Sequence, residues 1–288
     1  MSIGIIQSFM DITVNSILTV DKDAKIYLCS DQKIHFHNIE KFQNIEIINL
    51  EDVVSDQTNK IKKYDIFKGT IFESNPLWGR ALLRIFYLRD IQKELNLKKV
   101  IHFDNDILIY KPYEEIKEYF HSSKFNITPA SNNRLIFGYS LIQNYDIFNE
   151  ICKLLDKKIE EGIKKDWDFN NFIPPTEMDL LAMIYKENSN LFNLLPVLPY
   201  DSSIIFDPLS YGMYIDGSHT SPRKFYSRRY VDFNDQIGVE LFSKRIKTKF
   251  VNNNPVVYWN NKTFDMSNMH IHSKRFEKFL PRGYKNYI

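Results

Sequence analysis

Residues 99–110 read Lys-Val-Ile-His-Phe-Asp-Asn-Asp-Ile-Leu-Ile-Tyr, an apolar run interrupted by two aspartates. Short apolar runs rich in β-branched residues predict buried strands. Side chains alternate along a strand, so Asp104 and Asp106 are expected on the same side, with their backbones about 6–7 Å apart. Two unpaired carboxylates are costly to bury, and a divalent cation bound by their oxygens would offset that cost. The alternative is that the strand ends here and the pair is solvated or capped.

Composition restricts the class of protein. The 288 residues are enough for one large domain, or one domain with an appendage. The 38 basic and 36 acidic residues balance, so no overall field favours nucleic acid, and we expect no nucleic-acid partner. The sequence contains neither a G-x-G-x-x-G nor a P-loop pattern.

The expected compartment follows from the cysteines and the hydropathy pattern. Cys29 and Cys152 lie in apolar contexts, which predicts buried thiols rather than a disulfide framework or a zinc site. The sequence begins without a basic region followed by an apolar one, and no apolar run is as long as a membrane span. We therefore expect a cytoplasmic protein.

Further strands are expected on both sides of the central stretch. They are short runs rich in apolar and β-branched residues. The predicted strands are residues 3–7, 25–29, 45–50, 126–129, 135–142 and 191–198. Gly138, inside the fifth of these, permits close approach of a ligand to the backbone, or marks a bulge.

A helix is predicted to begin at Asn75, as N-cap, and to run to about Leu95. Arg84 lies within its apolar stripe, and Arg80 lies one turn earlier on the same side. An arginine on a buried face requires an anion. That anion is either a phosphate or nucleotide, or one of the aspartates Asp31, Asp104 and Asp106.

Two more helices are predicted, over residues 145–160 and from Glu177 to about Glu187. Thr176 and Asp179 have the spacing of a capping box, so Asp179 is either a helix cap or a carboxylate that faces a substrate. Glu177 has the same two interpretations, because an acidic residue in the first turn also complements the helix dipole.

The segment Met269-His-Ile-His-Ser-Lys274 places two histidines and a lysine at alternate positions. If it is extended, His270, His272 and Lys274 share one side. One imidazole would complete a metal site, and the ammonium group would neutralise a phosphate. The basic and aromatic tail, residues 276–288, is expected to form a closing helix or a peripheral contact with a membrane surface.

These residues together resemble a known family. Arg84 on a helix, followed by His-Phe-Asp-Asn-Asp at 102–106, resembles the nucleotide-binding half of the GT-A glycosyltransferases that carry a D-x-D motif. The resemblance covers roughly residues 70–280. Three later segments are similar to a group of bacterial and viral glycosyltransferase-like proteins: Phe206-Asp-Pro208, Tyr211–Gly217 and His270–Lys274.

The resemblance implies an α/β fold of the GT-A type. It is expected to be a single domain with one Rossmann-like, mostly parallel central sheet flanked by helices. Residues 1–125 would form the nucleotide-binding half, and residues 126–288 the acceptor-binding half with a closing segment. The nucleotide sugar would bind at the strand ends, where α/β sheets commonly bind ligands.

The resemblance also implies roles for individual residues. Asp106, helped by Asp104, would hold Mn²⁺ or Mg²⁺ on the donor diphosphate, with His272 or His270 as a third ligand. Lys274 would contact phosphate, and Asp31 would meet the nucleotide base. Gly138 would lie against the donor sugar. Relatives tend to have Gly-Gln-Tyr where this chain has Gly-Met-Tyr at 212–214, so a polar contact at Met213 is not expected.

The function that we expect is metal-dependent transfer of a sugar from a nucleoside-diphosphate sugar, with a UDP-sugar as the expected donor, to a saccharide or glycolipid acceptor. An inverting enzyme needs a base for the acceptor hydroxyl. The candidates are Glu177, Asp179, Asp207 and Asp216. Two alternatives stay open, namely a haloacid-dehalogenase-like phosphatase with Asp104 as nucleophile, and a non-catalytic nucleotide-sugar-binding module.

Overall fold

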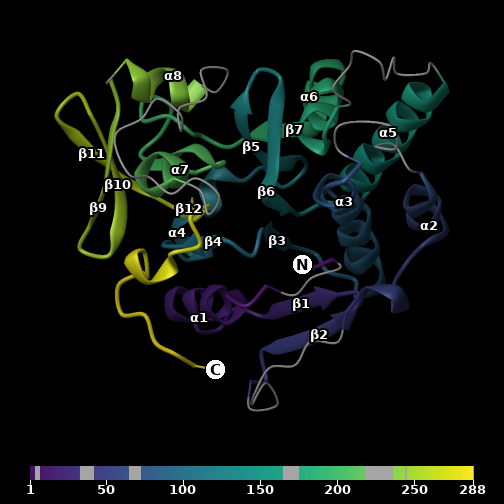
Figure 1. Cartoon of the computed structure of the whole chain (residues 1–288), viewed down its shortest axis with the longest axis horizontal. Helices are drawn as coiled ribbons and strands as arrows, with labels where there is room; N and C mark the ends of the chain where they lie inside the picture. Colours follow the sequence, from purple (N-terminus) through teal and green to yellow (C-terminus); the bar gives the residue numbers. More distant parts are fainter. Residues whose placement is uncertain are drawn as a thin grey trace.

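Mixed sheets packed between helices make up the computed structural model (Figure 1). The structure describes residues 1–3, 7–32, 42–64, 73–164, 175–217, 236–243 and 245–287. Its helices are α1 (Met10–Val20), α2 (Asp56–Lys63), α3 (Leu77–Glu94), α4 (Tyr113–Ile116), α5 (Tyr145–Lys164), α6 (Glu177–Glu187), α7 (Ser210–Asp216) and α8 (Gln236–Phe242). Its strands are β1 (Ile26–Ser30), β2 (Ile45–Asn49), β3 (Val100–Phe103), β4 (Ile107–Ile109), β5 (Phe125–Ser131), β6 (Arg134–Ile142), β7 (Phe192–Leu194), β8 (Ile204–Ile205), β9 (Lys247–Val251), β10 (Asn254–Trp259), β11 (Lys262–Met266) and β12 (Asn268–His270).

The prediction of a mostly parallel sheet is wrong. The central sheet has the order β3-β6-β5-β7, and only its β5–β7 pair is parallel. The β5 and β6 strands are joined by a tight turn, in which Ser131 pairs with Arg134. A connection of two residues can only join antiparallel strands, so the antiparallel pairing of β5 with β6 follows from this short turn. Parallel pairing recurs in β1–β2 and in β8–β11.

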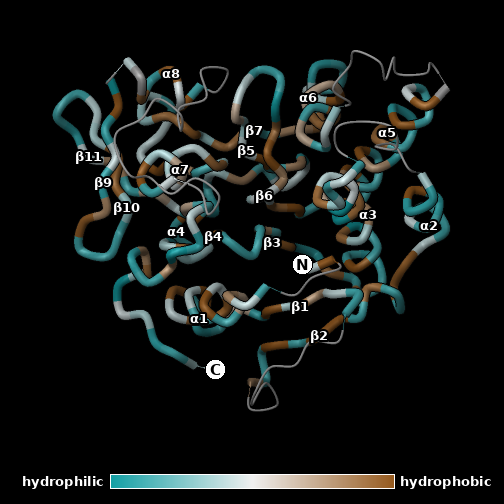
Figure 2. Tube along the Cα trace, in the orientation of Figure 1, coloured by the Kyte–Doolittle hydropathy of each residue, from teal (hydrophilic) through white to brown (hydrophobic). Residues whose placement is uncertain are grey.

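The largest apolar core lies between this sheet and the helices α3, α5 and α6. Phe86, Phe137 and Phe148 are fully buried in it, and so are Ile151 and Leu155 of the amphipathic helix α5. Figure 2 shows hydrophobic residues along β5, β6 and β7 and hydrophilic residues over most of the C-terminal tail. Burial of these large side chains fixes α3 and α6 against the sheet, which sets the position of the side chains that α3 and α6 carry.

A second core joins α7 and α8 to the sheet β8-β11-β10-β9. This sheet lies at the opposite side of the molecule from α2 and α5 (Figure 1). The fully buried Tyr211 at the start of α7 anchors it, since its hydroxyl donates to the carbonyl of Val197 at 2.8 Å. The core therefore holds α7 in place beside β12.

The aspartate motif does not lie on one strand. β3 ends at Phe103, β4 begins at Ile107, and residues 104–106 form a turn between them. The two strands also join different sheets, because β3 pairs with β6 whereas β4 pairs with β12. The prediction of one continuous strand through both carboxylates is therefore wrong. The turn places the two carboxylates between the β3–β6 pair and the β4–β12 pair.

Several local predictions are confirmed. The helix predicted from Asn75 to about Leu95 forms as Leu77–Glu94, with Pro76 rather than Asn75 at the N-cap position. The helix Glu177–Glu187 also forms, and Thr176 and Asp179 make the predicted capping box. Cys29 and Cys152 are buried free thiols. The predicted strand 3–7 falls largely on residues 4–6, which lie outside the described residues. The predicted strand 191–198 is shorter than expected, because only Phe192–Leu194 is extended in a sheet.

The basic tail does not form the closing helix that was one of its two expected structures. It makes a single 3-10 turn, Phe276–Lys278, and then lies along α1. The amide of Tyr287 donates to Asn15 Oδ1 at 2.8 Å, and the amide of Lys285 donates to Thr19 Oγ1 at 3.1 Å. Within the described ranges, no helix combines the length and apolar character that crossing a bilayer requires. Contact of the tail with a membrane surface stays a prediction.

Candidate metal and nucleotide-sugar site

The site is built around the turn that contains Asp104 and Asp106. The amide of Ile107 donates to the carbonyl of Asp104 at 3.0 Å, which closes the turn. The amide of Asp104 donates to the carbonyl of Gly138 on β6 at 2.8 Å, and the carbonyl of Asp106 accepts from the amide of Ile271 at 2.7 Å. The backbone thus fixes one carboxylate near β6 and the other beyond the end of β12.

Arg84, His102, Asp104 and Glu177 form what we call the Asp104 cluster. The guanidinium group of Arg84 on α3 donates to Asp104 Oδ1, and its other terminal nitrogen lies 3.4 Å from Glu177 Oε1 at the start of α6. His102 Nε2 lies 3.9 Å from the same Asp104 oxygen. One cation therefore lies between two carboxylates, which answers the sequence question about Arg84 in favour of an internal carboxylate partner.

The Asp104 cluster contains three buried polar atoms without a hydrogen-bond partner among the described residues: Arg84 Nε, His102 Nε2 and Glu177 Oε2. Burial raises the pKa of Glu177, although the nearby Arg84 partly opposes the shift. Burial lowers the pKa of His102 well below its usual value, and Arg84 adds to this, so His102 is neutral. Buried polar atoms are nearly always paired, so these three indicate a place for a polar ligand or ordered water.

Asp106, His270, His272 and Lys274 form what we call the Asp106 cluster. His270 Nε2 lies 2.9 Å from Asp106 Oδ1, and Lys274 Nζ donates to Asp106 Oδ2. The ring of His272 stacks on that of His270 with centroids 4.0 Å apart. Burial alone would raise the pKa of Asp106, but His270 and Lys274 outweigh it and hold the pKa well below the usual range.

The histidines and the lysine meet Asp106 through a turn, and not through an extended strand as predicted. β12 ends at His270, and the amide of Lys274 donates to the carbonyl of Ile271 at 3.0 Å. Lys274 has a φ of 58°, a left-handed conformation that is uncommon for residues other than glycine. This turn folds His272 back over His270 and directs the ammonium group of Lys274 to Asp106.

The donor atoms of the Asp106 cluster fit a divalent cation. One carboxylate oxygen of Asp106 and one ring nitrogen from each of His270 and His272 lie within 4.8 Å of one another. Burial, and then the charge of His270, lower the pKa of His272 to about 2, and its Nε2 has no partner among the described residues. A neutral imidazole with a free nitrogen is a good metal ligand. Two nitrogen donors favour Mn²⁺ over Mg²⁺, which prefers oxygen.

The carboxylate of Asp207 holds the backbone beside the Asp106 cluster in place. This carboxylate is fully buried and accepts from three backbone amides, those of Tyr211, Gly212 and His270, at 3.0–3.1 Å. Gly212 of α7 lies so close to β12 that a Cβ atom there would fall far inside contact distance of the His270 carbonyl. Burial raises the pKa of Asp207, although these amides oppose the shift. The carboxylate of Asp207 thus ties α7 to the backbone of a candidate metal ligand.

Two of the predicted base candidates have other partners. Asp216 forms a two-point ion pair with Arg275, whose Nε and terminal nitrogen lie 2.8 and 2.5 Å from its carboxylate oxygens. Asp179 accepts from the amide and hydroxyl of Thr176 at 2.9 and 2.8 Å, as a capping residue does. Both carboxylates are therefore engaged in holding local structure, and Glu177 is the candidate base that lies in the Asp104 cluster.

Of the remaining predicted site residues, Arg80, Gly138 and Met213 lie on elements already named in this section, whereas Asp31 follows β1, which carries no residue of either cluster. Asp31 follows β1 and is half-buried, and Arg80 is half-buried one turn before Arg84 on α3. A Cβ atom on Gly138 would lie 2.9 Å from Asp104 Oδ2, so this glycine leaves room for that carboxylate. Met213 lies in α7 and is half-buried.

Sequence reasoning missed the contributions of His102, Gly212 and Arg275. A signal for His102 was available, because a histidine two positions before Asp104 on a buried strand has to be packed or paired. Gly212 carried a weaker signal, since a glycine near the start of a helix indicates close approach of another backbone only when the partner is known. Arg275 could not be paired with Asp216 without the fold.

None of the protein-family models matches the chain, and no curated protein matches it. Among solved structures, the chain is similar to that of mouse xyloside xylosyltransferase 1 in its apo form, at 11% identity, with 66% of this chain and 79% of that chain covered and a TM-score of 0.39. It is also similar to the PaToxG glycosyltransferase, at 17% identity, with 66% and 68% covered and a TM-score of 0.35. The likeness is distant in both cases.

Proposed function

We propose that this protein is a metal-dependent glycosyltransferase that moves a sugar from a nucleoside-diphosphate sugar, with UDP as the expected nucleotide, to a hydroxyl group of a saccharide or glycolipid. The observation that carries the proposal is the meeting of Asp106 with His270, His272 and Lys274 from a segment more than 160 residues later in the chain. A carboxylate, two imidazoles and an ammonium group in one place suit a diphosphate with its cation.

Asp106, His270 and His272 would hold the cation, and Lys274 would bind the diphosphate. A bound Mn²⁺ ion supplies positive charge that stabilises the departing diphosphate. Lys274 pairs with Asp106 in this structure, and its long side chain would reach a phosphate oxygen if a bound cation neutralised that carboxylate instead.

Glu177 would act as the base in the Asp104 cluster, if the reaction inverts the anomeric centre. The oxygen of the acceptor hydroxyl forms a bond to the anomeric carbon, the bond from that carbon to the diphosphate oxygen breaks, and the hydroxyl proton passes to the Glu177 carboxylate. Burial raises the pKa of this group, which makes it a stronger base than an exposed glutamate. Arg84 would keep the carboxylates of Asp104 and Glu177 apart and oriented.

A thermal-shift screen of nucleoside-diphosphate sugars, with and without Mn²⁺, tests the proposal. A ligand that binds only the folded state raises the melting temperature, and saturation at about 100 times Kd stabilises by about 2.7 kcal/mol. We expect at least one donor to raise the melting temperature only when Mn²⁺ is present, and to be hydrolysed slowly to free sugar. If every donor leaves the melting temperature unchanged in both conditions, the proposal is wrong.

Substitution of Glu177→Gln tests the base. Because glutamine cannot accept the proton, we expect kcat for transfer to fall about 10²-fold or more while donor binding is kept. The wild-type kcat/KM should fall on the acidic side at a pH above that of a free glutamate, and this acidic limb should be lost in the variant. If kcat and the pH profile are unchanged, Glu177 is not the base, and NMR of the product anomer would then be expected to show retention.

A further inference from the structure

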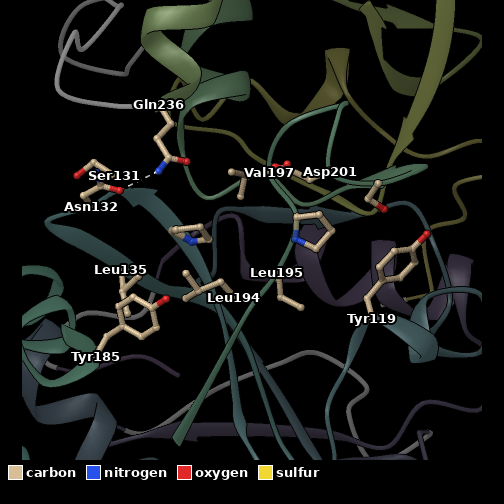
Figure 3. A pocket seen from close by; sticks show the side chains of 13 residues that line it. Tyr119, Ser131, Asn132, Leu135, Tyr185, Leu194, Leu195, Val197, Asp201 and Gln236 are labelled. Atoms are coloured by element: carbon tan, nitrogen blue, oxygen red, sulfur yellow. Dashed lines mark hydrogen bonds between the residues drawn. The ribbon is translucent and has the colours of Figure 1, made fainter. Parts of the chain in front are cut away.

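A cavity lies away from both clusters, where β5, β6 and β7 meet the segment that leads to β8 (Figure 3). Its volume is about 440 Å³, within the usual range for small-molecule sites. The tip of the β5–β6 turn, the start of α8 and residues 194–202 surround it. No role has been assigned above to any of the side chains that line it.

The floor of the cavity is apolar. It is formed by Leu135, Leu194, Leu195, Pro196 and Val197. Figure 3 shows Leu194 and Leu195 in the middle of the lining, between Tyr185 on one side and Tyr119 on the other. Leu135, Leu195 and Val197 are themselves buried, so the floor is a rigid part of the core. Leu194 and Pro196 are half-buried and supply the exposed apolar surface, which suits the C–H faces of a ring because removal of such surface from water is favourable.

The rim of the cavity is polar and uncharged except at one position. Asn132 and Gln236 stand on one side, where Gln236 Nε2 donates to Asn132 Oδ1 at 3.4 Å, and the hydroxyls of Tyr119 and Tyr185 stand on the others (Figure 3). Asp201 supplies the one charged group among the described lining residues. A rim of amides, hydroxyls and one carboxylate offers donors and acceptors to neutral hydroxyl groups. With no cation in that lining, it disfavours phosphates and other anions.

An adjoining cavity of about 490 Å³ connects this place to the start of α6. The two cavities share Ser131, Asn132 and Gln236, and the second also reaches Arg134 and Asp179. The charges of these two residues are paired, since Arg134 Nε lies 3.6 Å from Asp179 Oδ1. Asp179 is two residues after the candidate base, Glu177. Arg134 is four residues before Gly138 on β6, roughly 13 Å along the strand from the point that touches Asp104.

We propose that these two cavities form a groove that binds a neutral oligosaccharide, the acceptor, away from its reacting end. The acceptor role rests on the proposed function, whereas the binding of a saccharide does not. The apolar floor takes ring faces, the amide and hydroxyl rim takes ring hydroxyls, and the groove ends at Asp179 in the first turn of α6, the helix whose buried side carries Glu177. A chain bound in this way presents its terminal hydroxyl to the Asp104 cluster, and the enzyme selects acceptors by more than their last residue.

Calorimetric titration with maltopentaose, cellopentaose and chitopentaose, without Mn²⁺ or nucleotide, tests the groove. We expect at least one of these neutral sugars to bind, with millimolar or better affinity. Asn132→Trp places an indole over the groove from an exposed turn and should weaken binding at least about tenfold. Ser122→Trp, on an exposed turn before the other end of β5, is the matched control and should bind as the wild type does.

Asp201→Ala removes a hydrogen-bond acceptor from the opposite rim. It keeps the test informative if the tryptophan variant does not fold. It should also weaken binding, by about threefold to tenfold, the usual effect of losing one hydrogen bond. The groove proposal is overturned if none of the three sugars binds at a concentration of about 10 mM. It is also overturned if both variants bind the sugar as the wild type does, or if UDP with Mn²⁺ competes with the sugar.

Donor hydrolysis separates this proposal from the proposed function. Hydrolysis to water does not need the groove, so Asn132→Trp should keep it while losing transfer to the oligosaccharide that binds. Sugar binding without turnover of any nucleotide sugar would overturn the transferase and the acceptor role together, and would leave a saccharide-binding groove. Donor turnover with no sugar binding would overturn the groove alone.

Discussion

The two carboxylates of one short turn are neutralised in different ways. Asp104 is paired with Arg84, a cation that is always charged and is held between two carboxylates by α3 and α6. Asp106 is paired with His270, at the end of β12, and with Lys274, in the turn that follows. Of the two clusters, the Asp104 cluster is therefore held by two helices of the largest core, and the Asp106 cluster is the one that we propose to hold a metal ion.

The difference follows from the elements that supply each cluster. α3 and α6 are packed on the largest core, so Arg84 and Glu177 approach Asp104 from rigid supports. The Asp106 cluster depends on a turn in which Lys274 has an unfavourable backbone conformation, and on α7, which is held through Asp207. Strain of this kind is found where the surrounding structure imposes it, commonly at ligand sites.

The largest effect is expected when the two aspartates are exchanged for asparagine one at a time. Asp106→Asn should lower Mn²⁺ affinity at least about 100-fold and donor turnover about 10³-fold, because it removes a ligand and leaves buried cations unpaired. Asp104→Asn should change Mn²⁺ affinity by less than about tenfold, since its carboxylate belongs to Arg84. Mn²⁺ titration by calorimetry and a donor-hydrolysis assay measure both effects.

Asp265→Asn is a control for the general effect of losing one negative charge. Asp265 lies on β11, away from both clusters, and pairs with Lys111. It should leave Mn²⁺ affinity unchanged. Equal losses of Mn²⁺ affinity in Asp104→Asn and Asp106→Asn would contradict the comparison, and would mean that both carboxylates hold the cation together.

The second effect concerns the glycine that supports each cluster. Gly212→Ala drives a methyl group into the backbone carbonyl of His270, which has no room to yield, so we expect a loss of about 3 kcal/mol in the free energy of unfolding. Gly138→Ala meets side chains rather than backbone, with Asp104 Oδ2 nearest at 2.9 Å, so the loss should be about 1 kcal/mol or less. Urea unfolding of both variants measures these values.

Gly79→Ala is the control for Gly212→Ala, because an added Cβ at Gly79 meets nothing within 4 Å in helix α3. The change should stabilise the protein by up to about 1 kcal/mol, as alanine does in a helix interior. A Gly212→Ala variant as stable as the wild type would show that β12 is free to move away from α7.

The third effect separates the two neutral histidines. His272→Ala removes a ring whose unpaired nitrogen lies in the metal group, and should lower Mn²⁺ affinity by about tenfold to 100-fold. His102→Ala removes a ring that stacks on Phe137, and should leave Mn²⁺ affinity unchanged. The same calorimetric titration decides between them, and an effect of His102→Ala as large as that of His272→Ala would join the two clusters into one metal site.

Sequence reasoning reached the residues of both clusters better than their geometry. Local rules succeeded where neighbours in the chain decide the outcome, as in the capping box at Thr176 and Asp179 and in the strand over residues 135–142. The single-strand interpretation of Asp104 and Asp106 was wrong because pairing with β6 on one side and β12 on the other imposes a turn between them. Such pairing is a tertiary effect that periodicity does not contain.

The antiparallel pairing of β5 with β6 also depended on one feature that was not recognised. Asn132 and Asn133 lie between two predicted strands, which is a hairpin signal, and an antiparallel pair follows from it. The carboxylate partners of Arg84 and Arg275 could not be selected from the sequence, because several carboxylates were equally available to each of these arginines. Only the packing of α3 on α6, and of α7 on the last turn, makes the choice.

The smallest expected effect is on the pH dependence of the free energy of unfolding. It tests whether burial in the Asp104 cluster makes the charged form of Glu177 unfavourable. Arg84 faces this carboxylate from α3, Asp104 from the turn and Asp179 from its own helix. Burial raises its pKa in the folded protein, so the protonated form is favoured there. Its contribution to stability is fully present below the ordinary pKa of glutamate and is lost as the pH rises through the raised folded value.

Glu177→Gln should therefore flatten the fall in the free energy of unfolding as the pH rises from the ordinary glutamate pKa toward neutrality, measured by urea unfolding without metal. Glu187→Gln, at the exposed end of the same helix, is the control and should keep the wild-type slope. A slope that Glu177→Gln leaves unchanged would mean that Arg84 compensates the buried charge fully. In that case the Asp104 cluster would be balanced without a ligand, and its three unpaired atoms would need only ordered water.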